Sequence, residues 1–184
     1  MNDSEERVIL VDGDDNVVGI DEKLATHRTG ALHRAFSVII WDNLGRLLLQ
    51  KRNVRKYHSG GQWTNACCGH PRPDEDIAAA VSRRLEEEMG FTCSLESFGT
   101  MRYRAELDRG MIEHELVHMF RGVYDGVVVP DSDEVESFRW SSLEDVQADI
   151  GATPEHFTAW FRKYVAAKWP MTLGGRGDRN QSRG

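Results

Sequence analysis

Residues 63–91 place the strongest constraint on the fold, because they join a loop rich in turn-forming residues to a helix with one apolar face. The expected helix runs from about Asp74 to Met89, with Glu75 at its start and Gly90 at its end. Apolar side chains recur at four-residue steps along it, at Ile77, Val81, Leu85 and Met89. A stripe of this kind packs against another layer of structure. The helix therefore predicts a sheet beneath it.

Segments rich in apolar and β-branched residues supply that sheet. Residues 7–12 and 17–20, with the turn-forming sequence GDDN between them, predict an N-terminal β-hairpin, and the polar residues 21–30 begin with a helical turn. Further strands are expected at 33–42, 46–52, 91–107, 112–124 and 135–140, with a loop at 53–62. The predicted fold class is α/β, of the α+β type, in which a mixed sheet is flanked by helices and extended by the N-terminal hairpin.

Two helices are expected after the last strand. Ser141 and Glu144 have capping-box spacing for the first, and Thr153 followed by Pro154 caps and starts the second. The second helix ends by Pro170 and carries the apolar and aromatic residues Phe157, Trp160, Phe161, Tyr164 and Val165. We expect one domain over residues 1–173 and a disordered tail over 174–184, which has no apolar side chain.

Composition and charge exclude several classes of function. The chain has 184 residues, a formal net charge of −7 and a pI near 5.5, whereas a general nucleic-acid binder needs a basic face. No apolar run approaches the roughly 20 residues of a membrane span, and the first residues, MNDSEERVIL, lack the pattern of a signal peptide. Three cysteines are too few for a disulfide framework. The sequence therefore predicts reduced thiols, a cytoplasmic location, no nucleic-acid partner and no membrane span.

Charged residues on the expected helix form a candidate magnesium site. Arg83 and Glu87 have the spacing of an i,i+4 ion pair, to which we assign a structural role. Arg84 and Glu88 are four residues apart and share a helix face. A carboxylate at position 84 could have helped Glu88 to bind several metal ions, but the arginine there is a cation and cannot be a ligand. One Mg²⁺ bound by Glu88 and by phosphate oxygens of a ligand is expected instead of several. A run of glutamates alone is more often a solvated helix face, but the surrounding loop and helix favour function here.

Histidines and a second pair of glutamates suggest a transition-metal site. Glu113 and Glu115 lie two apart on an expected strand and face one side, whereas His114 and His118 face the other. Zinc or manganese would suit the nitrogen and oxygen set that these glutamates offer together with His27, His33 and His70. A lone histidine is more often a surface residue or a hydrogen-bonded core residue. We keep that interpretation for His58, His114, His118 and His156.

One cysteine is a candidate for chemistry. A free cysteine is usually a small buried hydrophobe, but Cys68 is two residues from a candidate metal ligand and precedes the predicted helix and its loop. Cys67 faces away from Cys68 if the segment is extended, and Cys93 is expected to serve packing.

The order of these motifs resembles that of a known family. Gly69, Glu75, Arg83, Leu85, Glu87, Glu88 and Gly90 have the spacing of a Nudix box, the loop and helix that holds magnesium against a diphosphate. The segments HRAFSV, WTNACCGHP, RRLEEEMG, MRYRAEL and IEHE, and the Arg52 and Lys56 pair, are similar to those of the type 1 isopentenyl diphosphate isomerases, which have the Nudix fold. Arg84, a departure from the general box, resembles what the isomerases carry there. The match extends from about Lys23 to Trp160.

The resemblance implies a reaction and a role for each matching residue. The isomerases interconvert isopentenyl and dimethylallyl diphosphate by adding and removing a proton, in isoprenoid biosynthesis. The implied catalytic pair is Cys68 and Glu115, with Tyr103 hydrogen-bonded to the glutamate. The implied transition-metal ligands are His27, His33, His70, Glu113 and Glu115, and Glu88 resembles the residue that helps to hold Mg²⁺ on the substrate diphosphate. The implied substrate-binding residues are Lys23, Arg52, Lys56, Arg84 and Trp160, the last being a carbocation-stabilising indole that would otherwise be read as a core aromatic.

Two other functions remain as alternatives. A Nudix hydrolase that cleaves nucleoside or other diphosphates is supported by the box and opposed by Arg84. A non-catalytic module that binds metal or diphosphate would bind the ligand without turning it over. The expected oligomeric state is a monomer, with a dimer as the alternative.

Overall fold

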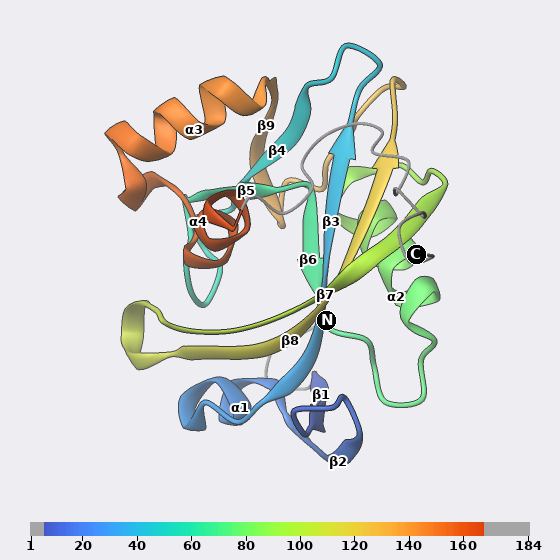
Figure 1. Ribbon diagram of the computed structural model, residues 1–184, viewed down its shortest axis with the longest axis vertical. Helices are drawn as coiled ribbons and strands as arrows, with labels where there is room; N and C mark the ends of the chain where they lie inside the picture. The colour runs from blue at the N-terminus through green and yellow to red at the C-terminus, as the bar shows by residue number, and fades with distance from the viewer. Residues whose placement is uncertain (1–5, 168–184) are drawn as a thin grey trace, which may run out of the picture.

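The strand that begins at residue 33 is the centre of a nine-stranded sheet in the computed structural model, which describes residues 6–167 (Figure 1). This strand, β3 (His33–Trp41), pairs in parallel with β8 (Ile112–Val123) and antiparallel with β6 (Cys67–Gly69). Every residue of β3 except Arg34 is buried. The cause is that helices cover both faces of the sheet at this point. The mixed sheet of the predicted fold class is confirmed.

The N-terminal hairpin and the turn of helix after it are also confirmed. The hairpin pairs β1 (Arg7–Val11) with β2 (Val17–Glu22) and joins the sheet where Leu10 meets His33. The helix α1 (Lys23–Thr29) follows directly, and Gly30 ends it in the left-handed conformation. The N-terminal hairpin and α1 therefore both lie next to the start of β3.

The predicted hairpin at 33–52 forms, but its two strands separate immediately after the turn. β4 (Leu47–Arg52) pairs with β3 only at Trp41 and Leu47. Its other residues pair with two more strands, β5 (Trp63–Asn65) and β9 (Val135–Ser141). The opened space between β3 and β4 admits β6, which carries the candidate thiol. β7 (Leu95–Glu106) and β8 form the long predicted pair, joined by a 3-10 turn at Asp108–Gly110.

Alternation along β3 divides the core into two layers. One layer contains Ala35, Ile39 and Trp41 and packs against the C-terminal helices. The other contains Phe36, Val38 and Ile40 and packs against α2 (Ile77–Met89), whose predicted stripe is largely buried. In Figure 1 the C-terminal helices and α2 lie on opposite sides of the sheet.

Three predicted helix boundaries are wrong. The helix α2 begins at Ile77 instead of about Asp74, because Asp76 is its N-cap and accepts a bond from the Ala79 amide at 3.0 Å. The helix α3 (Leu143–Ala152) is capped by Ser142 and not by Ser141, which remains paired with Leu47 in the sheet.

The last predicted helix also starts later than expected. Pro154–His156 forms only a 3-10 turn, η2, and α4 (Ala159–Ala166) begins after Thr158. The physical cause is a contact with β5, since Phe157 is extended and the Thr158 amide donates to the Trp63 carbonyl at 3.0 Å. The aromatic residues predicted for this helix are buried, as expected. Pro170 and the tail at 174–184 lie outside the described residues.

Gly90 is required at the end of α2 by its backbone conformation. Its φ is +74°, and a Cβ there would lie 2.2 Å from the Val129 carbonyl oxygen. We expect Gly90→Ala to lower the free energy of unfolding by at least roughly 1–3 kcal/mol, measured by urea denaturation. Gly151→Ala is the matched control, because Gly151 lies in α3 with no atom within 4 Å of the added Cβ. That change should be neutral or stabilising by up to about 1 kcal/mol, and equal effects at the two glycines would contradict the prediction.

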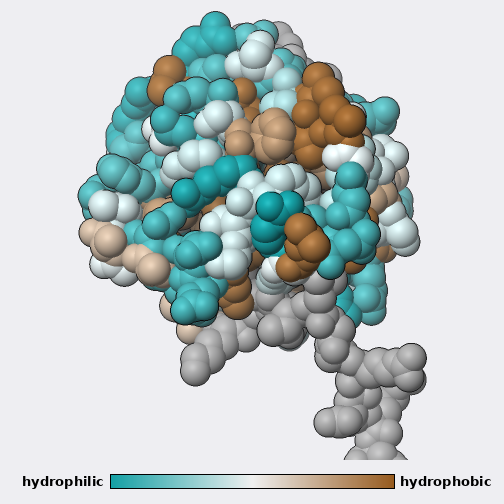
Figure 2. Space-filling model, turned by 90° about the horizontal axis from the view of Figure 1, so that it is seen from above, coloured by the Kyte–Doolittle hydropathy of each residue, from teal (hydrophilic) through white to brown (hydrophobic). Residues whose placement is uncertain are grey.

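The surface is mainly polar on the face shown in Figure 2, where apolar side chains form separate groups among hydrophilic ones. Within residues 6–167, no helix has the length and the apolar composition that crossing a membrane requires.

Candidate active site

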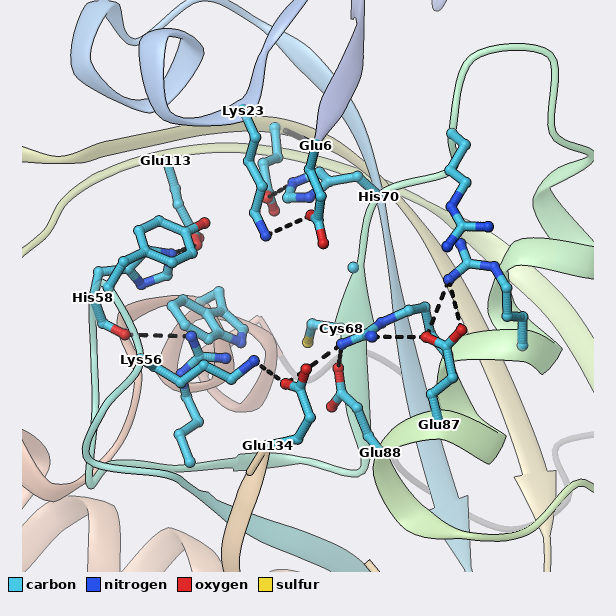
Figure 3. A pocket seen from close by; sticks show the side chains of 18 of the residues that line it. Glu6, Lys23, Lys56, His58, Cys68, His70, Glu87, Glu88, Glu113 and Glu134 are labelled. Carbon is cyan, nitrogen blue, oxygen red and sulfur yellow. Dashed lines mark hydrogen bonds and ion pairs between the residues drawn. The ribbon is translucent and has the colours of Figure 1, made fainter. Parts of the chain in front are cut away.

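A cavity of about 610 Å³ brings together residues from segments that are distant in the sequence (Figure 3). Its lining includes Lys56 from the 53–62 loop, Cys68 from β6, Glu88 from α2, Glu115 from β8 and Trp160 from α4. In the view of Figure 3, Cys68 lies between two groups of side chains. His70 and Glu113 are in one, and Lys56, Glu88 and Glu134 are in the other.

Strand register places Glu115 between two partners. It lies opposite His33 on β3 and opposite Tyr103 on β7, and directly opposed residues on neighbouring strands face the same side of a sheet. The Tyr103 hydroxyl donates to Glu115 Oε2 at 2.7 Å, which is the predicted hydrogen bond. The same hydroxyl also contacts Glu113, so Glu113 and Glu115 face the same side, as predicted.

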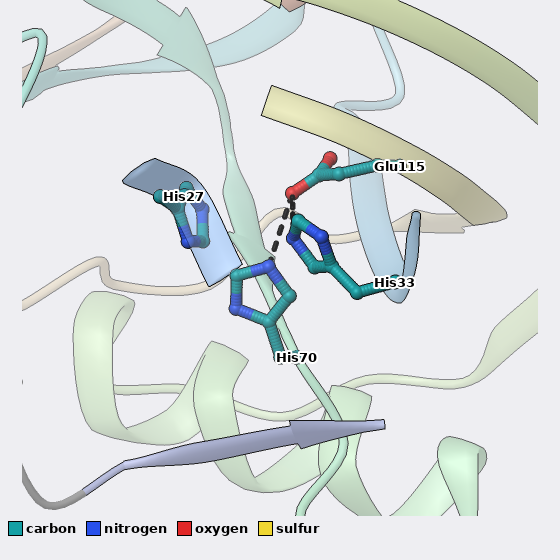
Figure 4. Close-up of side chains that lie close together, drawn as sticks. All are labelled: His27, His33, His70 and Glu115. Carbon is teal, nitrogen blue, oxygen red and sulfur yellow. Dashed lines mark hydrogen bonds and ion pairs between the residues drawn. The ribbon is translucent and has the colours of Figure 1, made fainter. Parts of the chain in front are cut away.

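Three histidines converge on Glu115 from separate elements (Figure 4). Ligand atoms of His27, His33, His70 and Glu115 all lie within 4.8 Å of one another. The Nδ1 atoms of His27 and His33 contact backbone carbonyl oxygens at 2.7 and 2.9 Å, so these atoms carry the ring protons. Within the described residues, the Nε2 atoms of these two rings are buried and have no hydrogen-bond partner. Orphaned nitrogens that face a carboxylate fit a divalent transition-metal ion.

Electrostatics hold this group in protonation states that suit a metal. Burial and the neighbouring His70 and His33 lower the pKa of His27 to about 3, and burial lowers the pKa of His70. Burial opposes ionisation of Glu115, but the imidazoles of His33 and His70 beside it prevail and hold its pKa well below the usual value. Neutral imidazoles and an ionised carboxylate are the forms that bind metal ions.

Glu113, the fifth predicted ligand, lies in an adjoining group with His27 and His58. Burial and the charge of Glu115 raise the pKa of Glu113 well above its ordinary value. His58 was interpreted from the sequence as a surface residue or a hydrogen-bonded core residue. It is 3% exposed, and it lies at the site, because its Nε2 is 3.4 Å from Glu113 Oε1. No pattern of spacing marks His58, because its loop has no regular periodicity.

Cys68 is held by Ser37 and Asn65, which the sequence did not single out. Its Sγ lies 3.1 Å from Ser37 Oγ and donates to Asn65 Oδ1 at 3.3 Å, and Ser37 in turn contacts the Tyr164 hydroxyl at 2.9 Å. Burial raises the pKa of Cys68 to about 12, although the bonds to Ser37 and Asn65 oppose the rise, so the group is a thiol at neutral pH. The one available signal was Ser37 itself, a hydroxyl within the otherwise apolar residues 35–41.

The other two cysteines agree with the sequence analysis. Cys67 is fully buried in the core layer under α2, so it faces away from Cys68 as predicted. Cys93 packs against the same layer. All three cysteines are free.

The predicted cationic residues line the cavity, and most of them contact carboxylates. Lys23 pairs with Glu6 at 2.7 Å, and Lys56 pairs with Glu134. The Arg52 guanidinium lies over the Trp160 ring, with 5.4 Å from Cζ to the ring centroid. These contacts gather several cations at one end of the cavity.

Arg84 reaches Glu88 as the helix spacing predicted. It contacts Glu88 and also pairs with Glu87 at 2.8 Å. Glu88 accepts a further bond from Gln50 at 2.7 Å, and Arg84 and Lys56 lower its pKa against the opposing effect of burial. A buried carboxylate that stays ionised at the cavity is suited to one hard cation.

The Arg83 and Glu87 ion pair is present at 3.1 Å. Arg83 also grips Glu75 through two bonds of 2.7 and 2.9 Å, which ties the loop before α2 to the helix. Trp160 is 2% exposed and its Nε1 donates to Thr64 at 2.9 Å, so the same ring belongs to the core and lines the cavity.

The remaining histidines lie outside the cavity lining. His114 contacts the Gly30 carbonyl at 3.0 Å, and His118 contacts Asp15 at 2.9 Å. His156 has a side chain that is 65% exposed. These three are surface or hydrogen-bonded residues, as expected.

Sequence comparisons identify relatives that match most of the chain. The family model described as "NUDIX domain" matches residues 31–161. An isopentenyl-diphosphate Delta-isomerase of Burkholderia multivorans is 52% identical over 157 residues, which cover 85% of this chain and 89% of the relative. The protein of the same name from Serratia proteamaculans is 46% identical, with 85% and 88% covered.

Solved structures share the fold at lower identity. The protein DR0079 of Deinococcus radiodurans aligns with a TM-score of 0.71 and 16% identity, over 89% of this chain and 99% of that one. A MutT protein of Methanosarcina mazei aligns with a TM-score of 0.61 and 22% identity, over 74% and 91%. At these identities the likeness establishes the Nudix fold alone.

Proposed function

Because this chain belongs to the isopentenyl-diphosphate Delta-isomerases, a family with the Nudix domain, we propose that it interconverts isopentenyl and dimethylallyl diphosphate in isoprenoid biosynthesis. The observation that carries this proposal is the lining of one cavity. It combines the Cys68 thiol, the Glu115 carboxylate and a group of cations. Such a cavity can anchor a diphosphate at one end and move protons at the other.

The diphosphate binds among Lys23, Arg52, Lys56 and Arg84. Its oxygens take the places of the carboxylates that these cations now contact, since a phosphate group offers several strong acceptors for charge-assisted hydrogen bonds. Glu88 would hold one Mg²⁺ together with phosphate oxygens of the substrate, because Mg²⁺ prefers few carboxylates and the oxygens of a bound phosphate. Release of Glu88 from Arg84 would accompany that step.

Cys68 and Glu115 carry out the proton transfers at the hydrocarbon end. Isomerisation adds a proton to the terminal alkene carbon of isopentenyl diphosphate and removes one from the carbon on the other side of the branched carbon. The group that acts as acid loses a proton and the group that acts as base gains one, so the reverse reaction exchanges the two roles. Tyr103 orients the Glu115 carboxyl through its hydrogen bond.

A divalent transition metal, Mn²⁺ or Zn²⁺, would be held by His27, His33, His70 and Glu115, with Glu113 beside them. When bound, such an ion increases the acidity of a carboxyl group that it touches. The buried and unpartnered Nε2 atoms of His27 and His33 support this assignment among the described residues.

Trp160 stabilises the positive charge that develops on the substrate. The intermediate is a tertiary carbocation, which water would trap, and an indole face attracts a cation. Its ring lines the cavity and already takes part in a cation–π contact with the Arg52 guanidinium. The apolar residues around Trp160 exclude water from that end.

The decisive test is proton NMR of isopentenyl diphosphate in deuterium oxide with the purified protein, Mg²⁺ and Mn²⁺ or Zn²⁺. We expect dimethylallyl signals and deuterium uptake into the allylic positions. Release of phosphate, or of a nucleoside monophosphate from nucleotide substrates, with no isoprenoid product, would overturn the proposal in favour of a Nudix hydrolase. Binding of isopentenyl diphosphate without any turnover would indicate a non-catalytic module.

Lys56 gives the reaction an expected pH dependence. Burial lowers its pKa to about 8; Glu88 opposes this fall, and Arg52 and Arg84 add to it. The ammonium is therefore lost as the pH rises through about 8, and with it a contact to the diphosphate. We expect kcat/KM for isopentenyl diphosphate, which reports on the free enzyme, to decline above about pH 8.

Lys56→Arg tests the origin of this decline, because a guanidinium stays charged throughout the range. The decline should move to higher pH in Lys56→Arg and stay in place in the control Lys51→Arg, since Lys51 pairs with Glu136 and is not part of the cavity lining. An unchanged pH profile in Lys56→Arg would contradict the assignment.

The proposal extends to the setting of the protein. We place the enzyme in the cytoplasm, because its three cysteines are free and reduced thiols persist there. Residues 1–173 act as one isomerase domain, and the enzyme works as a monomer in which one chain supplies every residue proposed for the reaction. Sedimentation of the purified protein in the presence of substrate tests the monomer against a dimer.

A further inference from the structure

His58 has a place in the site that no step above uses. Its ring is 3% exposed and lies between Tyr57, at 4.3 Å between ring centroids, and Trp160, at 5.8 Å. The backbone holds it there as well. The carbonyl of His58 accepts from Arg52 at 3.3 Å, and the next amide, of Ser59, donates to Asp108 at 2.9 Å. The His58 ring is therefore held in one orientation, in which it faces a particular side chain.

The side chain that His58 faces is the carboxyl group of Glu113. The His58 Nε2 atom lies 3.4 Å from Glu113 Oε1, while the other oxygen of Glu113 contacts the Tyr103 hydroxyl. The Nδ1 atom of His58 lies 3.3 Å from the Ser59 hydroxyl, which can donate to it when the ring proton is on Nε2, the atom that faces Glu113. Both oxygens of Glu113 are thus contacted, and Figure 3 shows His58 and Glu113 facing each other.

His58 is unsuited to ligate a second ion. The groups formed by His27, His58 and Glu113 and by His27, His33, His70 and Glu115 share His27. The Nδ1 atom of His27 is engaged by the Lys23 carbonyl at 2.7 Å, which leaves only Nε2 to bind metal. One nitrogen lone pair can bind only one ion. The two groups of residues therefore share a single metal ion, and His58 lies beside its ligands.

We propose that His58 is a positioning residue that orients Glu113 toward the divalent transition metal. Residues that hold a ligand's free atom typically change metal affinity by about 10–100-fold when they are removed. The inference rests on the metal site of the proposed function. Because His58 and Lys56 share one loop, it also links the diphosphate-binding cations to the metal ligands.

The test measures metal affinity in the absence of substrate, by competition of the purified protein with a chromogenic chelator for Mn²⁺ or Zn²⁺. We expect His58→Ala to bind about 10–100-fold more weakly than the native protein. His58→Gln should recover most of the affinity, because its amide nitrogen stands where Nε2 does, whereas His58→Asn, with its amide at the Nδ1 position, should not. His156→Ala, at an exposed histidine, is the control and should bind like the native protein.

Three outcomes would overturn the inference in distinguishable ways. If the native protein binds neither metal, the metal site of the proposed function fails. If it binds and His58→Ala binds equally well, only the role of His58 fails. The absorption spectrum of bound Co²⁺ separates positioning from ligation. A spectrum in His58→Gln that differs from the native one would make His58 a ligand, and a matching spectrum supports positioning. Circular dichroism melting confirms that each variant is folded at the assay temperature.

Discussion

Cys68→Ala is expected to abolish isomerisation, with a fall in kcat on the order of 10³-fold or more and little loss of fold. A positioned acid or base typically contributes about 10²–10⁴-fold, and no other thiol reaches the cavity lining in the described residues. The variant should still bind inorganic pyrophosphate with native affinity, because the cations contact the diphosphate and the thiol does not. The measurements are initial rates by proton NMR and pyrophosphate binding by calorimetry.

Cys67→Ala is the matched control for this prediction. Cys67 is the adjacent residue, but its side chain is buried in the opposite core layer, so its loss affects packing and leaves the proton transfers in place. Its kcat should stay close to the native value at a temperature well below its melting point. A Cys68→Ala protein that still isomerises at more than about a tenth of the native rate would remove Cys68 from the mechanism, because loss of a positioned acid or base costs more than this.

Glu115→Gln is expected to lose isomerisation to a similar extent and, in addition, to lose metal affinity. The amide keeps the shape of the side chain and a contact for Tyr103, but it is neither an acid nor an anion. His70 and His33 lose their charged partner at 3.0 and 3.6 Å, and the candidate metal loses a carboxylate ligand. Rates by NMR and chelator competition for Mn²⁺ measure the two effects separately.

Excess metal distinguishes the two parts of this prediction. At a Mn²⁺ concentration that saturates the variant, Glu115→Gln should remain inactive, because the proton-transfer group is still missing. Recovery of the native rate would restrict Glu115 to metal binding. Glu96→Gln, a change at an exposed glutamate on β7 that pairs with Arg121, should retain both the rate and the affinity.

Local periodicity is what made many of the site residues predictable. Glu113 and Glu115 face one side because a strand alternates with period two, and Arg84 meets Glu88 because residues four apart share a helix face. These relations depend on backbone geometry alone. The same periodicities predicted correctly which main segments are helices and which are strands, but they did not predict where the helices begin. Ser141 cannot cap a helix because it pairs with β4 in the sheet, and the last helix starts late because Phe157 pairs with Trp63 of β5.

The sequence by itself therefore determined the fold class, the family resemblance and the set of side chains available for proton transfer and metal binding. Tertiary structure alone decided which of them meet. It turned His58 inward against Glu113, supplied Ser37 and Asn65 to the Cys68 thiol, and set Glu134 against Lys56. The physical reason is that contacts made by loop residues and between distant strands depend on how whole layers pack. No repeat within a short segment encodes that packing.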